Sequence, residues 1–122
     1  MENSTEFIKK VVPEMVLKKA RETKWFDEQE VEDIENFNGD TFQEYANKAE
    51  NEDFILIEEA SHGGYEGAGE DTWVVYSLND KKSNERIYFQ INGWYNSWDA
   101  TEWADIIMVE PKEVIVIKWS KI

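Results

Sequence analysis

The stretch TWVVYSLNDKKSNERIYFQI, residues 72–91, decides the fold. Its two ends, Thr72–Tyr76 and Arg86–Ile91, are rich in β-branched and aromatic residues, and the run Leu78–Asn84 between them is mostly polar. Apolar runs joined by a cluster of turn-forming residues are typical of two antiparallel strands in a hairpin. The sequence therefore predicts a β-hairpin in the C-terminal half of the chain.

Further strands are expected on both sides of this hairpin. Phe54–Ile57 and Glu113–Trp119 have the same β-branched and aromatic composition, and Trp103–Val109 predicts a fifth, shorter strand. We expect a strongly bent antiparallel sheet of four to five strands, or a small SH3-like barrel.

The N-terminal part has the period of helices instead. Apolar residues recur at helical spacing from Phe7 to Val16, with lysines on the other side, and Ser4 or Thr5 can cap the element. Pro13 falls inside this stripe and removes a backbone donor. We therefore expect either a kink or two short helices, the second with Pro13 in its first turn.

A helical hairpin is expected over residues 27–50. Asp27 with Glu30, and Thr41 with Glu44, have the spacing of capping boxes. The turn-forming residues Asn38–Asp40 separate the two helices. Together these patterns predict an α+β fold in which short N-terminal helices pack on the sheet.

Length and composition limit the classes of protein. A chain of 122 residues can bury one ordinary core, so we expect a single domain, helical over residues 1–52 and β over residues 53–122. There is no cysteine, which excludes disulfides and thiol nucleophiles. No apolar run is long enough to span a membrane, and the start MENSTEFIKK does not resemble a secretory signal. We expect a cytoplasmic protein that does not bind membranes.

The net charge of −14 is unevenly distributed. The segment from Asp27 to Asp71 has sixteen Asp and Glu residues and a single Lys, whereas residues 1–26 are slightly basic. Such a surface attracts basic clefts of other proteins and repels nucleic acid itself. The carboxylates that we expect to form an acidic face are Glu28, Glu32, Asp33, Glu35, Asp40, Glu44 and Glu50.

The segment SHGGYEGAGED, residues 61–71, has four glycines and the only histidine. A phosphate-binding loop is not favoured, because Glu66, Glu70 and Asp71 would repel the anion. We expect a connection between two strands, or a contact loop that presents Tyr65 to a partner together with these three carboxylates. His62 has no second histidine or nucleophile motif to work with, so we expect no catalytic residue.

Asp99, Glu102 and Asp105 are spaced three apart, as ligands of Mg²⁺ or Ca²⁺ on one helical face would be. The same spacing suits an amphipathic turn. No calcium loop and no HExxH motif is present, so we expect no metal and no cofactor, although this triad leaves cation binding open.

The segment NGWYNSWDATEW, residues 92–103, concentrates large aromatic residues among turn formers. We expect Trp94 and Trp103 in the core and Tyr95 and Trp98 at the surface, where they would contact a protein partner. Stacking on single-stranded nucleic acid requires a positive groove, and no basic patch lies near these residues in the sequence.

Three of these segments also carry a resemblance. GGYEGAGED, YFQINGWYNSWDATEW and VEPKEVIVIKW, within residues 57–119, are similar to segments of small uncharacterised proteins encoded by bacteriophages and prophages. In those proteins a GGYEGxGE loop, a GxYxSxxxTEW segment and a VEPKE strand occur together. The resemblance implies a phage accessory protein, and many of these inhibit host defence, as anti-CRISPR proteins do. It implies no catalytic residues.

Two functions follow as expectations. The first is an inhibitor whose acidic face mimics nucleic acid and occupies the basic cleft of a host defence protein of the CRISPR or restriction type. The second is a non-enzymatic binding or assembly module that uses the aromatic residues of its β half. The sequence does not indicate the oligomeric state.

Overall fold

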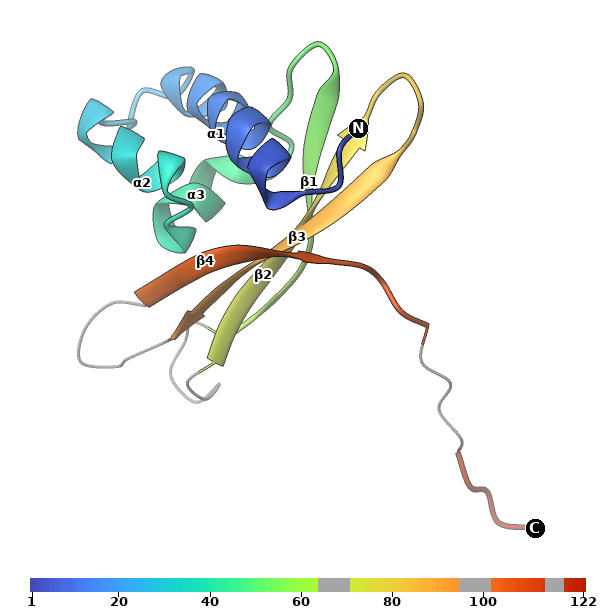
Figure 1. Cartoon of the computed structure of the whole chain (residues 1–122). Coiled ribbons are helices and arrows are strands. Elements are labelled where there is room, and N and C mark those ends of the chain that lie inside the picture. The colour runs from blue at the N-terminus through green and yellow to red at the C-terminus, as the bar shows by residue number, and fades with distance from the viewer. Residues whose placement is uncertain (64–70, 95–101, 114–117) are drawn as a thin grey trace.

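The computed structural model describes residues 1–63, 71–94, 102–113 and 118–122. Within them a helical part precedes a β part, which is the expected α+β fold. The helical part consists of α1 (Thr5–Arg21), the 3-10 helix η1 (Glu28–Glu30), α2 (Val31–Glu35) and α3 (Gly39–Ala46). The strands are β1 (Phe54–His62), β2 (Asp71–Asp80), β3 (Arg86–Trp94) and β4 (Glu102–Val109). The helices lie together on one face of the sheet (Figure 1).

The sheet is an antiparallel meander in the order β1-β2-β3-β4. The predicted hairpin is confirmed as β2 and β3, whose ladder runs from Asn79 opposite Arg86 to Asp71 opposite Trp94. β1 and β4 are the two edges, so in the part of the chain that the structure describes the sheet is open and does not close into a barrel. Irregular pairing near Glu59 and Asn92 interrupts the outer ladders, as bulges that bend strands do.

The predicted short strand at residues 103–109 is confirmed as β4. The strand predicted over Glu113–Trp119 lies mainly outside the described residues. Its described members, Glu113, Lys118 and Trp119, belong to no strand. Residues 110–113, which follow β4, instead lead away from the sheet (Figure 1).

α1 is one continuous helix, so of the two alternatives expected at Pro13 the pair of short helices is wrong. Ser4 caps the helix as expected, because its hydroxyl accepts a hydrogen bond from the Phe7 amide. Pro13 is buried in the helix interior, where a proline costs about 3 kcal/mol. Buried residues on both sides of it, from Ile8 to Ala20, hold the helix against the core, and this packing offsets the missing hydrogen bond.

The predicted helical hairpin is confirmed, but its second cap is not where the sequence placed it. Asp27 caps η1 through a bond from the Gln29 amide, as expected. α3 begins at Gly39, so Thr41 is already inside it, and the Thr41 hydroxyl donates to the Asp33 carboxylate across the hairpin. The connection reverses at Phe37, which adopts a left-handed backbone with φ of 55°.

One cluster of buried side chains joins the helical and the β parts. Val12 and Val16 of α1 and Phe42 of α3 are fully buried with Tyr76 and Phe89 of the central strands. The aromatic rings meet edge to face, as between Phe42 and Tyr76, or stack, as between Tyr76 and Phe89. The sheet therefore has an inner face, which the helices cover, and an outer face, which they leave open.

Candidate functional site

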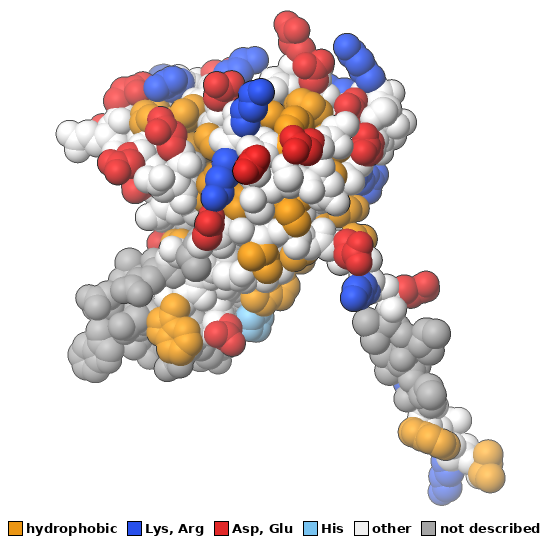
Figure 2. Space-filling model, viewed as in Figure 1, with side chains coloured by type: hydrophobic (Ala, Val, Ile, Leu, Met, Phe, Trp, Pro, Cys, Tyr) orange, Lys and Arg blue, Asp and Glu red, His pale blue; other side chains and the backbone are white. Residues whose placement is uncertain are grey.

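The seven carboxylates of the expected acidic face lie on or beside η1, α2 and α3, and we call them the acidic surface. They are Glu28, Glu32, Asp33, Glu35, Asp40, Glu44 and Glu50. All are exposed except Asp33, which is half-buried under Thr41. Asp and Glu side chains stand over the helical layer with Lys and Arg side chains nearby (Figure 2). The helical hairpin thus brings most of the acidic segment to one part of the molecule.

Two members of the acidic surface are neutralised by ion pairs. Arg21 donates two hydrogen bonds to Glu28 over 3.1 Å, and this carboxylate raises the pKa of the Arg21 guanidinium. Lys81 lies 2.9 Å from the Glu50 carboxylate and lowers the pKa of Glu50. No ion pair within the described residues involves the other five. The uncompensated charge therefore lies on α2 and α3.

Most of the loop and aromatic residues expected to meet a partner lie outside the described residues. These are Tyr65, Glu66, Glu70, Tyr95 and Trp98. Asp71 is described and is exposed at the start of β2.

The two tryptophans expected in the core differ. Trp103 of β4 is partly buried and packs so closely on α3 that a Cβ placed on Gly39 would lie 2.1 Å from its indole. Trp94 is 48% exposed, so its expected burial is wrong. It is the last residue of β3, opposite Asp71 and Glu102, and lies three residues beyond the last fully buried residue of the strand, Ile91.

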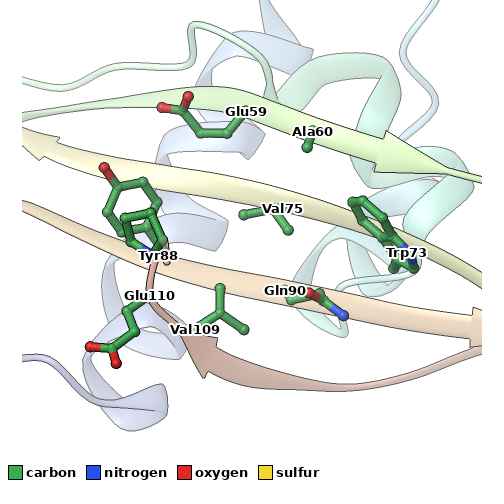
Figure 3. A pocket seen from close by; sticks show the side chains of 9 residues that line it. Glu59, Ala60, Trp73, Val75, Tyr88, Gln90, Val109 and Glu110 are labelled. Atoms are coloured by element: carbon green, nitrogen blue, oxygen red, sulfur yellow. The ribbon is translucent and has the colours of Figure 1, made fainter. Parts of the chain in front are cut away.

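The outer face of the sheet carries a hollow of about 380 Å³ that the sequence analysis missed. Side chains from all four strands line it on the side away from the helices (Figure 3). They are Glu59, Ala60, Trp73, Val75, Tyr88, Gln90 and Val109, with Glu110 and Pro111 after β4. The register explains the grouping, because Ala60 faces Val75, Val75 faces Gln90, and Tyr88 faces Val109. The hollow is apolar at its centre with a carboxylate on two sides.

A second hollow, of about 460 Å³, lies at the end of the sheet where β1 and β2 meet β3. His62 stacks on Trp73 there, with 5.8 Å between the ring centres, and Asp71 and Asn92 are part of the lining. Its neighbours in the sequence lie outside the described residues, so the site is incomplete. Thr72 and Gly93 also line this hollow, and the Thr72 hydroxyl donates a hydrogen bond to the His62 carbonyl oxygen.

The other titratable groups of the β part have structural roles. The Ser77 hydroxyl donates to Glu59 and accepts from the Asn79 amide, which fixes the Glu59 carboxylate at the hollow. Burial raises the pKa of the Tyr76 hydroxyl far above its ordinary value, so this group is neutral in the core.

The sequence left cation binding by Asp99, Glu102 and Asp105 open, but the helical face that would hold them is wrong, because Glu102 and Asp105 belong to β4. Asp99 lies outside the described residues, and Asp105 pairs with Lys9 at 3.2 Å. In the described part of the chain, no group of three or more His, Asp or Glu side chains is arranged to hold a metal ion. Nor does any helix there have the length and apolar character needed to cross a bilayer.

The acidic surface and the two hollows are therefore described from the structure alone. Comparison of the chain with protein-family models, with curated proteins and with solved structures found no match in any of the three.

Proposed function

We propose that this protein is a non-enzymatic inhibitor that binds a nucleic-acid-binding protein through the acidic surface. The observation that carries the proposal is the charge of the helical hairpin. Residues 25–47 contain eight Asp and Glu and neither Lys nor Arg, and five members of the acidic surface have no ion-pair partner within the described residues.

Carboxylates on short rigid helices can occupy the phosphate sites of a basic cleft. A cleft that binds nucleic acid attracts any surface of matching negative potential, and this attraction mainly speeds association. Helices hold their side chains in place better than loops, so less conformational entropy is lost on binding. The partner class is a protein with a basic nucleic-acid-binding cleft. The resemblance to phage accessory proteins favours a bacterial defence protein of the CRISPR or restriction type, met in the host cytoplasm.

The test is a charge-neutral variant with a matched control. Glu32→Gln, Glu35→Gln, Asp40→Asn and Glu44→Gln remove four charges from the acidic surface. Glu2→Gln, Glu14→Gln, Glu52→Gln and Glu58→Gln remove four exposed charges from other parts of the chain, so both variants have a net charge of −10 instead of −14. A difference between them reports the location of the charge and not its total.

The measurement begins with capture of proteins from bacterial lysate on the immobilised native chain and elution with a salt gradient. A captured protein is then purified and bound to a fluorescent DNA duplex, and the chain is added as competitor. The native chain and the control should displace the duplex, and the acidic-surface variant should need at least about tenfold more protein, since each close charge pair contributes up to about 1 kcal/mol in water. Equal competition by both variants contradicts the proposal.

The open face of the sheet supports a second candidate, a binding or assembly module of the β half. Its described residues are Trp73, Val75 and Tyr88 of the hollow. Tyr65, Tyr95 and Trp98, which the sequence predicts for this role, lie outside the described residues and stay a prediction. Binding there should resist salt, because apolar contacts are not screened.

A further inference from the structure

The outer face presents apolar surface that nothing in the described part of the chain covers. The half-buried side chains of Trp73, Val75 and Tyr88 line the hollow. Ile107 of β4 lies on the same face and is 46% exposed. Contiguous apolar surface of this kind marks interaction sites in soluble proteins.

The C-terminal segment is the second exposed apolar element. Its described residues after Glu113 include Trp119, which is 94% exposed, and Ile122, which is fully exposed. It leaves the body of the molecule at the hollow itself, since Glu110 and Pro111 line the hollow's rim. Residues 111–113 then lead away from the sheet (Figure 1).

The charges of the two elements are complementary. The hollow carries Glu59 and Glu110, and its lining has no Lys or Arg. Trp119 lies in the sequence KWSKI, between Lys118 and Lys121. An aromatic side chain flanked by two cations therefore matches an apolar hollow flanked by two carboxylates.

We infer that the C-terminal segment of one copy docks on the outer sheet face of a second copy, with Trp119 in the hollow and Lys118 and Lys121 beside Glu59 and Glu110. Trp119 and Ile122 are exposed and do not dock on the sheet of their own chain, so a second molecule is the surface that the segment meets. Reciprocal exchange fills both hollows and closes a two-fold symmetric dimer. This inference does not depend on the acidic surface.

Sedimentation equilibrium of the full chain over about 1–200 µM tests the dimer, because this range brackets a micromolar dissociation constant. The native chain should show a reversible equilibrium between monomer and dimer. Trp119→Ala should raise the dissociation constant at least about tenfold while leaving the circular dichroism spectrum and the urea midpoint unchanged, because the exposed Trp119 is no part of the folded core.

A charge exchange identifies the two surfaces. One variant carries Lys118→Glu and Lys121→Glu, and the other carries Glu59→Lys and Glu110→Lys. Each alone places like charges together and should stay monomeric. Mixed in equal amounts they should form a heterodimer, because both the segment and the hollow of each chain then meet opposite charges on the other.

Three outcomes overturn the inference. A native chain that is monomeric at every concentration, with a urea midpoint lowered by Trp119→Ala, shows that the segment docks on its own sheet. A native chain that is monomeric, with a urea midpoint that Trp119→Ala does not change, shows that the segment does not bind the outer face. The partner of that face is then a different protein. A dimer that survives both charge variants, with no preference for the mixture, uses another surface.

Discussion

The two faces of the sheet come from alternate residues of the same strands, yet they differ in burial. On the inner face Val74, Tyr76 and Phe89 are fully buried beneath the helices. On the outer face their neighbours Val75 and Tyr88 are half-buried around an open hollow. Because side chains alternate along a strand, a run such as TWVVY supplies apolar residues to both faces, but the helices cover only one.

The difference separates the residues that stabilise the fold from those that are available for contacts. Apolar burial contributes about 25 cal/mol per Å², so the sealed inner face supplies most of the stability of the lone chain. The outer face contributes less, and its aromatic residues can gain free energy only by meeting another surface. Substitutions on the two faces should therefore differ in their effect on folding.

The largest difference is expected between two adjacent residues of β3. Phe89→Ala leaves a cavity beside Tyr76 and Phe37 and should lower the free energy of unfolding by about 3–5 kcal/mol. Tyr88→Ala removes a half-buried ring from the hollow and should cost about 1 kcal/mol. Urea denaturation followed by circular dichroism measures both. Similar losses would mean that the outer face is covered in solution.

A smaller effect tests how the helical layer is fastened to the inner face. Gly39 begins α3 directly against the Trp103 indole, and a Cβ there would lie 2.1 Å from the ring. Gly39→Ala should therefore destabilise the protein by about 1–3 kcal/mol, although alanine is the better helix former. The free energy of unfolding in urea gives the value.

The control for this prediction is the same substitution in a Trp103→Ala background. Without the indole the added methyl group meets open space, and Gly39→Ala should then be neutral or stabilise the helix by up to about 1 kcal/mol. An unchanged penalty in this background would place the strain in the backbone of α3 and not in its contact with β4.

The sequence predicted those parts of the molecule whose pattern is local. The β2–β3 hairpin and the Asp27 cap depend on neighbours in the chain, and both were found. The α3 start was misplaced because Thr41 has a partner eight residues away, in Asp33, that no spacing rule includes. Tertiary packing likewise holds one helix through Pro13, where the sequence also allowed two short helices.

The hollow could not be predicted, because it depends on two facts that a sequence does not state. One is which face of the sheet the helices cover. The other is the register that brings Ala60, Val75, Gln90 and Tyr88 together across three strands. Trp73 and Tyr88 were already visible as strand residues, and their alternation with Val74 and Phe89 is the signal that a second apolar face exists.

The smallest expected effect is on the pH dependence of stability and involves the turn that joins β2 and β3 at one end of the sheet. The Asp80 carboxylate accepts hydrogen bonds from the amides of Lys82 and Ser83, and these bonds lower the pKa of Asp80. A carboxyl whose pKa is lower in the folded state stabilises the fold above its unfolded pKa of about 3.9, and this contribution is lost as the pH falls through the folded value.

Asp80→Asn keeps an acceptor oxygen but cannot titrate. Between pH 6 and pH 2.5, measured as urea midpoints, the native chain should therefore lose more stability than Asp80→Asn. Parallel losses in the two proteins would assign the acid sensitivity to Asp105 and Glu50. The pKa of Asp105 is lowered first by the Ile106 amide and then by Lys9 of α1, and the pKa of Glu50 is lowered by Lys81 of the β2–β3 turn.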